Sequence, residues 1–127
     1  MKIIIDQAIT AHQKGRLKEA EQLYRSILEN QPTNLDVNNN LGVLLCALGK
    51  FDEAKASYRK AIEIKPDYVD AHYNLGVVLQ ELGEHQKAIS SYEKAIQIQP
   101  DYAKAHNNLG NVLKELGEHQ KAISSYE

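Results

Sequence analysis

The chain has 127 residues, of which 43% are hydrophobic and 25% charged, a composition typical of one soluble globular domain. Fifteen lysines and arginines balance 17 acidic residues, which argues against nucleic acid or an anionic membrane as partner, because both attract a basic excess. The single cysteine excludes an internal disulfide, and the apolar run Ile3–Ile5 is too short for a signal peptide, so we expect a cytoplasmic protein.

Prolines and glycines mark a period of 34 residues along the whole chain. Each of them falls into one of three phases: Pro32, Pro66 and Pro100; Gly15, Gly49, Gly83 and Gly117; Gly42, Gly76 and Gly110. A fixed period of this length is typical of solenoids, in which each repeat is one supersecondary unit. We therefore predict a single array over residues 1–127, with repeats 1–34, 35–68, 69–102 and 103–127, the last one truncated.

Within each repeat the apolar residues recur at three- and four-residue steps in two blocks, which predicts two helices. In repeat three the first helix should end at Gly83, since glycine adopts the left-handed C-cap conformation without a Cβ clash. The second should close at Pro100, which has no N–H to continue the helical ladder. Small residues at Gly76 and Ala88 should let the two helices approach closely.

The predicted fold class is all-α, an α-solenoid of tandem antiparallel helix pairs. One helix pair cannot bury its apolar face alone, so stability should come from the stacking of neighbouring repeats. The 127-residue sequence stops inside the predicted second helix of repeat four, which leaves the apolar face of that helix uncovered. We expect possible self-association through this uncapped carboxy-terminal edge.

The pattern resembles the tetratricopeptide repeat (TPR) family over the whole chain. Repeat two carries the family's positions as Leu41-Gly42, Leu45, Gly49, Ala54, Tyr58, Ala61 and Pro66, and repeat three carries Leu75-Gly76, Leu79, Gly83, Ala88, Tyr92, Ala95 and Pro100. The resemblance implies a right-handed superhelix whose first helices line a concave groove that binds protein or peptide partners. The sequence departs from the family at the opening aromatic position, replaced by Asn38, His72 and His106, and in repeat one, which has Gln7-Ala8 in place of Leu-Gly.

Repeats three and four show where a partner would bind. Aligned over 25 residues, they differ at only five positions: Val69/Ala103, Asp70/Lys104, Tyr73/Asn107, Val77/Asn111 and Gln80/Lys114. All five lie within an arc of roughly 100° on the first helix, on the side that the resemblance assigns to the groove. We interpret this stripe as the surface that reads the partner; drift of exposed positions is the alternative.

A constant stripe lies beside the variable one. Asn40, Asn74 and Asn108 recur in the groove phase, and an amide can donate to and accept from an extended peptide backbone. This stripe resembles the asparagine ladder of O-linked N-acetylglucosamine transferases, although asparagine is common at this position throughout the family. In repeat two, Asn39 and Val43 occupy two of the variable phases, and Val43 also belongs to an apolar stripe with Ile5, Ile9 and Val77. That stripe could hold an apolar side chain or pack against neighbouring helices.

No catalytic, metal or cofactor site is predicted. The histidines His72/His106 and His85/His119 are copies 34 residues apart, at a helix spacing of roughly 10 Å that is too wide to share a metal ion. We expect His12 to be solvated and Cys46 to be half-buried. The carboxylate clamp of chaperone-binding repeats is incomplete, because Asn108 stands where that clamp has arginine.

The leading functional hypothesis is a non-catalytic scaffold that binds extended peptide segments in its groove. One alternative is an amino-terminal targeting arm of a larger glycosyltransferase or sulfotransferase, since the stretch Ala8–Glu21 resembles bacterial arrays that precede such domains. A structural self-assembly unit is another.

Overall fold

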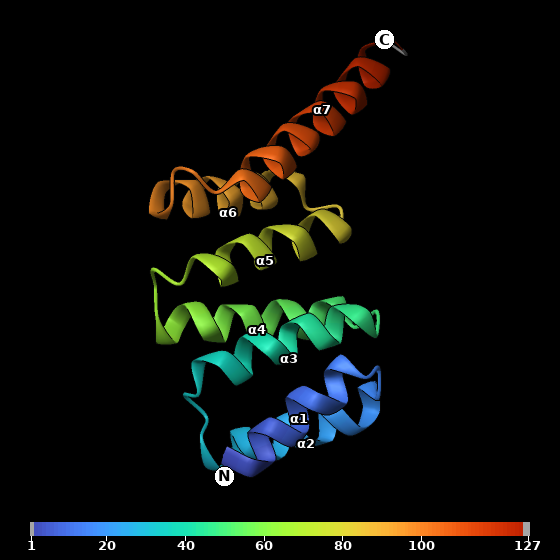
Figure 1. Ribbon diagram of the computed structural model, residues 1–127. Helices are drawn as coiled ribbons and strands as arrows, with labels where there is room; N and C mark the ends of the chain where they lie inside the picture. Colours follow the sequence, from blue (N-terminus) through green and yellow to red (C-terminus); the bar gives the residue numbers. More distant parts are fainter. Residues whose placement is uncertain (1, 126–127) are drawn as a thin grey trace.

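The computed structural model describes the backbone of residues 2–125 and the burial of residues 4–118 (Figure 1). The described residues contain seven helices and no strand. The helices are α1 (Lys2–Gln13), α2 (Leu17–Asn30), α3 (Leu35–Ala47), α4 (Phe51–Ile64), α5 (Val69–Glu81), α6 (His85–Ile98) and α7 (Ala103–Ser125). The prediction of an all-α solenoid is confirmed.

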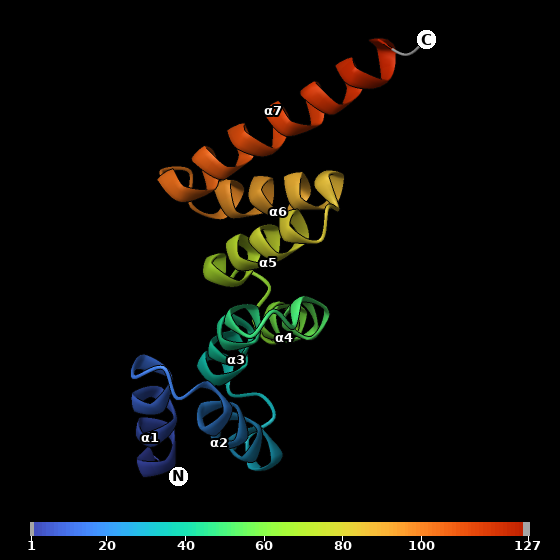
Figure 2. The ribbon, with the colours of Figure 1, turned by 90° about the vertical axis from the view of Figure 1, so that its right-hand side faces the viewer.

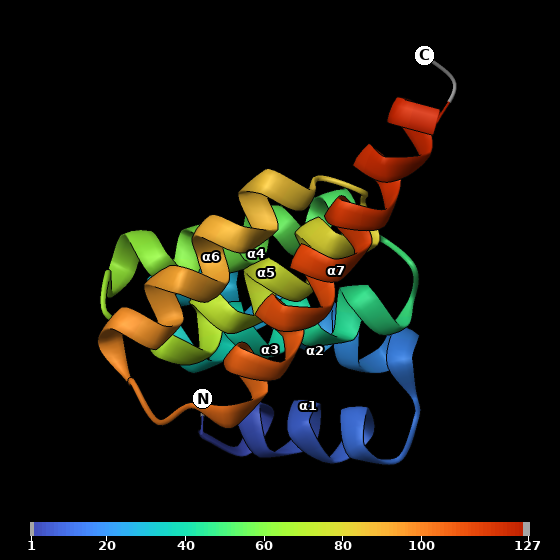
Figure 3. The same ribbon diagram turned by 90° about the horizontal axis from the view of Figure 1, so that it is seen from above.

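The first six helices form three antiparallel pairs that stack along one axis. The second helices α2 and α4 lie beside their first helices α1 and α3, whereas α6 lies above α5 in the same view (Figure 2). Seen along the stack, the pairs are rotated relative to one another (Figure 3). Successive helices contact each other throughout, so each pair is held by the next.

The turn inside each of the three pairs depends on glycine. Gly15, Gly49 and Gly83 have φ angles of 79°, 74° and 76°, in the left-handed region where other residues are strained. Each follows the last residues of a first helix, as predicted for Gly83. The turn geometry of the three pairs is therefore the same, and it comes from one residue of the period.

Close approach within a pair depends on a second glycine. A Cβ atom added to Gly76 would lie 2.5 Å from Cε1 of Tyr92, and one added to Gly42 would collide equally with Tyr58. Both tyrosine rings are buried in the core against the glycine backbone. Sequence reasoning found the need for a small residue at Gly76, and the structure adds that a tyrosine ring is what fills the space.

The hydroxyl groups of the buried tyrosines reach a side chain twelve residues earlier. Tyr92 donates to Oε1 of Gln80 at 2.9 Å, and Tyr58 lies 3.8 Å from Sγ of Cys46. Tyr24 lies 3.0 Å from Nδ1 of His12. The expectation that His12 is solvated was therefore wrong: the ring is half-buried against Tyr24, and burial lowers the pKa of His12.

The opening position of the first helix, where the family has an aromatic residue, has a structural task here. Nε2 of His72 and Nε2 of His106 each donate to the carbonyl oxygen of the proline six residues earlier, at 2.7 Å. Nδ2 of Asn38 does the same to the Pro32 carbonyl at 3.1 Å. These three side chains help to fix the loops that lead into α3, α5 and α7, because each satisfies a backbone carbonyl in the loop.

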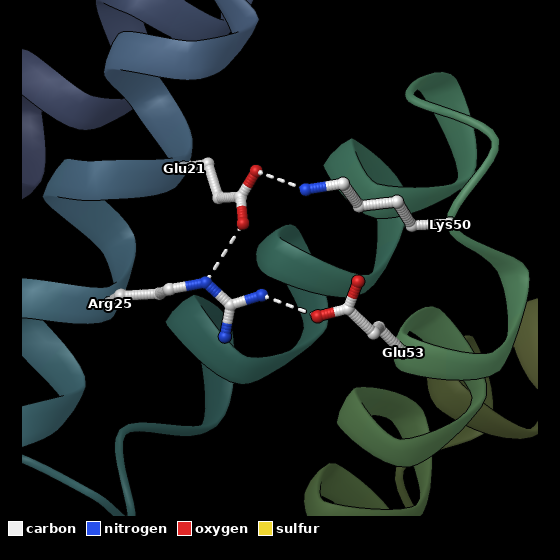
Figure 4. A network of polar contacts seen from close by, with 4 residues as sticks. All are labelled: Glu21, Arg25, Lys50 and Glu53. Atoms are coloured by element: carbon white, nitrogen blue, oxygen red, sulfur yellow. Dashed lines mark hydrogen bonds and ion pairs between the residues drawn. The ribbon is translucent and has the colours of Figure 1, made fainter.

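Charged side chains join the second helices of neighbouring repeats. Between α2 and α4, Lys50 donates to Glu21 at 3.3 Å, while Arg25 bridges Glu21 at 2.9 Å and Glu53 at 3.1 Å (Figure 4). Between α4 and α6 the charges are exchanged, since Lys55 donates to Glu84 at 3.4 Å. The two interfaces use the same positions of the period with opposite signs.

The predicted helix pair of repeat four is not formed. Residues Ala103–Ser125 are one continuous helix, so the predicted helix end at Gly117 was wrong. Its first half packs on α6, and its second half projects away from the stack (Figures 1 and 2). Glycine permits a left-handed turn but does not impose it; a helix tolerates one at a cost of about 1 kcal/mol.

The straight course of α7 leaves part of its first half uncovered. Leu113 is 51% exposed, whereas its counterparts Leu45 and Leu79 are 1% and 2% exposed. Gly110, the counterpart of Gly42 and Gly76, has open space where a Cβ would lie. Both differences arise because no second helix folds back over this side of α7.

Candidate peptide-binding surface

The first helices carry a recurring row of side chains that are exposed or half-buried. On each helix the row follows steps of four, three and four residues, which keeps it on one helical face. We name this row the first-helix face; it comprises Asp36, Asn40, Val43 and Ala47 on α3, Asp70, Asn74, Val77 and Glu81 on α5, and Lys104, Asn108, Asn111 and Glu115 on α7. Every one of these residues is exposed or half-buried, so the face is open to a partner.

The predicted variable positions fall into three groups by burial. Asp70, Lys104, Asn107, Asn111 and Lys114 are exposed, and Tyr73, Val77 and Gln80 are half-buried. Asn39 alone is buried, with 8% of its surface exposed. The exposed group and Val77 fit the predicted partner surface, whereas Asn39 faces the neighbouring repeat.

The asparagines of the predicted ladder differ in what they bind. Nδ2 of Asn74 donates to Oδ1 of Asn39 at 3.2 Å. Nδ2 of Asn108 donates to the hydroxyl of Tyr73 at 3.2 Å and to that of Tyr92 at 3.3 Å. These bonds link each repeat to the one before it, at a separation of 35 residues in the pairs Asn39–Asn74 and Tyr73–Asn108. Asn74 and Asn108 therefore use part of their hydrogen-bonding capacity to join neighbouring repeats.

Asn40 is the exception. The position 35 residues before it is Ile5, which has no polar atom to offer. Asn40 is half-buried and forms no hydrogen bond with the described residues, so both its donor and its acceptor are open. The sequence shows Ile5 at this position. Its consequence for Asn40 becomes clear only from the hydrogen bonds of the other two pairs, Asn39–Asn74 and Tyr73–Asn108.

Two further predicted residues are engaged in packing. Gln80 accepts from Tyr92 and donates from Nε2 to Oε1 of Glu115 at 3.3 Å, so its amide is used on both ends. Tyr73 packs edge-on against Tyr102 with ring centroids 5.3 Å apart, and its ring lies 5.9 Å from that of Tyr92. These contacts fix the junction between repeat three and α7.

Sequence reasoning missed a tyrosine at the end of repeats two and three. Burial raises the pKa of Tyr68, and the negative charges of Asp36 and Asp70 raise it further. The pKa of Tyr102 is raised in the same way, with burial as the main cause and the negative charge of Asp70 as the next. The signal was available, since Tyr68 and Tyr102 share a phase of the period with each other, and Asp36 and Asp70 share another.

Cys46 has no feature of a reactive thiol. Burial raises the pKa of Cys46, and its sulfur faces the Tyr58 hydroxyl. A raised pKa leaves less thiolate, the reactive form, at neutral pH. The half-buried role predicted for this residue fits its surroundings.

Neither a metal-binding cluster nor a membrane-spanning helix occurs in the described part of the chain. No group of three or more histidine, cysteine or acidic side chains in these residues could hold a metal ion. None of the described helices combines the length and the apolar character that crossing a membrane requires. A hollow of about 470 Å³ lies between α1 and α2 and includes Gln7, Ala11 and Leu23. None of the predicted partner-binding residues lines it.

Comparison with known proteins places the fold among helical repeat domains. The chain matches models described as "TPR repeat", over residues 42–83 and 79–117, and "Tetratricopeptide repeat", over residues 11–58. No curated protein sequence matches it significantly.

Several solved structures are similar to this chain in fold. A crystal structure of MamA protein has a TM-score of 0.86 and 30% identity, covering 98% of this chain and 68% of that one. The O-GlcNAc transferase of Thermobaculum terrenum has a TM-score of 0.80 and 30% identity over 88% of this chain and 22% of its own. The first TPR of Spaghetti (RPAP3), solved bound to an HSP90 peptide, has a TM-score of 0.87 and 21% identity, with 91% of each chain covered. The period, the paired helices and the matched models together show that the chain belongs to the tetratricopeptide repeat family.

Proposed function

We propose that this chain is a non-catalytic, cytoplasmic protein-interaction scaffold that holds an extended segment of a partner along its first-helix face. The observation that carries the proposal is the contrast between repeats three and four. Their buried positions are shared, whereas the pairs Asp70/Lys104 and Val77/Asn111 change the charge and polarity of the face itself. Exposed side chains that differ between repeats, on a core that does not, are suited to binding different side chains of one ligand at successive repeats.

An extended segment matches the spacing of this face. Packed helices lie about 10 Å apart, and an extended chain advances about 3.3 Å per residue. Each repeat would therefore meet about three residues of the partner. The face offers a partner acidic groups at Asp36 and Asp70, apolar surface at Val43 and Val77, and a basic group at Lys104.

Relatives in the fold support this use. The first TPR of Spaghetti was solved with an HSP90 peptide, so a fold of this shape is able to hold a peptide. At 21% identity that structure supports the fold alone and not the same partner. The partner of this chain is accordingly defined by the chemistry of its own face.

A second candidate is a targeting arm attached to a larger transferase. The 30% identity to the Thermobaculum terrenum O-GlcNAc transferase favours it, although this chain spans 22% of that protein. An open reading frame that encodes a transferase domain in continuation of these residues would support this candidate, and one that encodes none would remove it.

Selection from a display library of linear peptides tests the scaffold proposal. Lys104→Glu should weaken binding of the selected peptides about tenfold, equivalent to about 1.4 kcal/mol, because it reverses a charge on the face. Lys94→Glu is the matched control, since Lys94 is exposed on the second helix α6. Equal effects of the two substitutions would point to net charge alone and contradict the proposal.

A further inference from the structure

The amino-terminal end of the stack carries a hollow that the proposed function does not use. It has a volume of about 470 Å³, lies between α1 and α2, and includes Asp6, Arg16, Glu19 and Leu23. The ionic groups of Arg16 and Glu19 lie 3.5 Å apart on two exposed side chains, and neither forms an ion pair with another described residue. We name this place the end hollow. None of its residues belongs to the first-helix face.

Repeat two shows what occupies the equivalent place in the array. One period after Arg16 and Glu19, the same two positions again hold a basic and an acidic residue, Lys50 and Glu53. Arg16 and Lys50 are each the N-cap residue of a second helix. Lys50 and Glu53 bind α2, to a glutamate at 3.3 Å and to an arginine at 3.1 Å (Figure 4). The second helix of the preceding repeat therefore fills at repeat two the place that is hollow at repeat one.

The residues by which α2 fills that place form one stripe. Glu21 and Arg25 make the two ion pairs, and Leu28 follows three residues after Arg25. Leu28 lines the remaining space between the two repeats together with Ser57, the counterpart of Leu23 in the end hollow. Positions i, i+4 and i+7 lie on one face of a helix. An acidic, a basic and an apolar residue at these steps therefore describe a helix that fits such a place.

The floor of the end hollow differs from the floor under α2. Gln7 and Thr10 are exposed at repeat one, whereas their counterparts Leu41 and Leu44 are 3% and 0% exposed where α2 packs on α3. An apolar helix surface over this floor would bury an amide and a hydroxyl without hydrogen-bond partners. A helix docked in the end hollow should therefore carry polar side chains toward α1 and one apolar side chain toward α2.

We infer that the end hollow is a docking site for one amphipathic helix of a partner protein, on a surface separate from the first-helix face. The acidic residue of this helix at position i would pair with Arg16. The basic residue at i+4 would pair with Glu19, and Asp6 adds a second negative charge on the same side. The apolar residue at i+7 would pack on Leu23. This inference goes beyond the proposed function and does not depend on it.

A second copy of this chain does not provide the helix that fits. In α6, the last second helix among the described residues, the two charged positions of the stripe hold Ile89 and Glu93. A copy stacked end to end would bring an apolar side chain to Arg16 and a like charge to Glu19. The charge pattern of the end hollow therefore favours a different protein over head-to-tail stacking of this chain.

The test uses the 127-residue chain and a stapled helical peptide with glutamate, arginine and leucine at positions i, i+4 and i+7, and alanine and glutamine elsewhere. Fluorescence anisotropy should show saturable binding. Arg16→Glu and Glu19→Arg should each weaken binding about fivefold, the scale of one exposed ion pair. The double variant Arg16→Glu/Glu19→Arg should prefer a control peptide in which the glutamate and the arginine are exchanged, because both ion pairs are then restored.

Matched variants separate the end hollow from the rest of the surface. Lys94→Glu on α6 and Lys104→Glu on the first-helix face should leave binding of this peptide unchanged. No binding, or binding that ignores the order of the two charges, would overturn the inference. Self-association of the chain that Arg16→Glu abolishes would also overturn it, since a second copy would then be the occupant. Because Lys104→Glu affects only the first-helix face, failure of this inference is distinguishable from failure of the proposed function.

Discussion

Residues 81–93 and 115–127 have the same thirteen-residue sequence, and their described parts adopt different structures. In repeat three the segment ends α5, turns at Gly83 and begins α6. In repeat four its first eleven residues continue α7 without a turn. In repeat three, α6 packs on both α5 and α7, and it is long enough to bury Ala95. The comparison shows that the turn sequence allows a helix pair, whereas contacts outside the turn decide whether one forms.

The largest contrast between the two repeats should appear at the glycines of close approach. Gly76→Ala forces its Cβ into the Tyr92 ring, and overpacking of this kind costs about 1–3 kcal/mol. Gly110→Ala meets open space and should instead stabilise α7 by about 0.5–1 kcal/mol, because alanine is the better helix former. Urea unfolding of both variants measures the difference. A similar loss of stability in both would mean that repeat four closes into a pair like repeat three.

The glycines of the turn give a second, smaller contrast. Gly83 has a φ of 76°, so Gly83→Ala should cost about 1–2 kcal/mol of unfolding free energy. Gly117 lies within the helix, and Gly117→Ala should stabilise it by up to about 1 kcal/mol. Thermal unfolding followed by circular dichroism reports both effects. A destabilising Gly117→Ala would contradict the continuous helix.

The junction between the two repeats can be probed at Tyr92. Tyr92→Phe removes the bond to Gln80 and the one from Asn108, and should cost about 1 kcal/mol. Tyr58→Phe is the control, since the Tyr58 hydroxyl faces only a sulfur atom at 3.8 Å and should lose little. If both variants unfold at the same denaturant concentration, the docking of α7 onto repeat three does not depend on this bond.

The smallest effect is expected from the ion pairs of the packed repeats. The hydrogen bond from Arg25 lowers the pKa of Glu21 below its ordinary value of 4.5, and Lys50 adds to this effect. Because the folded-state pKa is the lower one, the contribution is complete above pH 4.5 and is lost as the pH falls through the folded-state value. Glu21→Gln should reduce this part of the acid sensitivity and cost less than about 1 kcal/mol at neutral pH. An unchanged acid unfolding profile in the variant would contradict the assignment.

The sequence predicted those features that depend on one residue of the period. The turn at Gly83 and the small residue at Gly76 follow from backbone conformation and size, which every repeat presents in the same way. The position of the asparagine stripe was also predicted. The hydrogen bonds of these asparagines were not predicted, because they depend on the residue that the preceding repeat places opposite each amide. Asn39 and Tyr73 can form such a bond, whereas Ile5 cannot.

The failure at Gly117 has a different physical origin. A period read from the sequence treats each copy as equivalent. The segment is packed between neighbouring helices in repeat three, whereas the described residues of its second copy, up to Ser125, project away from the stack in α7 (Figures 1 and 2). Helix formation is decided by such tertiary packing more than by local preference. The proposed partner surface is less affected, because it lies on first helices that are formed in all four repeats.

The exchanged ion pairs between second helices favour one order of the repeats in the array. Glu21 pairs with Lys50, and Lys55 pairs with Glu84, so each second helix carries charges that complement those of the adjacent second helix. Deletion of residues 35–68 would keep every glycine and proline in phase, yet it would set Glu21 against Glu84 and Arg25 against Lys87. Repeat proteins are prone to misassembly during folding, in which a repeat packs on one that is not its neighbour in the sequence. Alternating charge between adjacent second helices therefore favours the native order of the repeats over a packing that skips one of them.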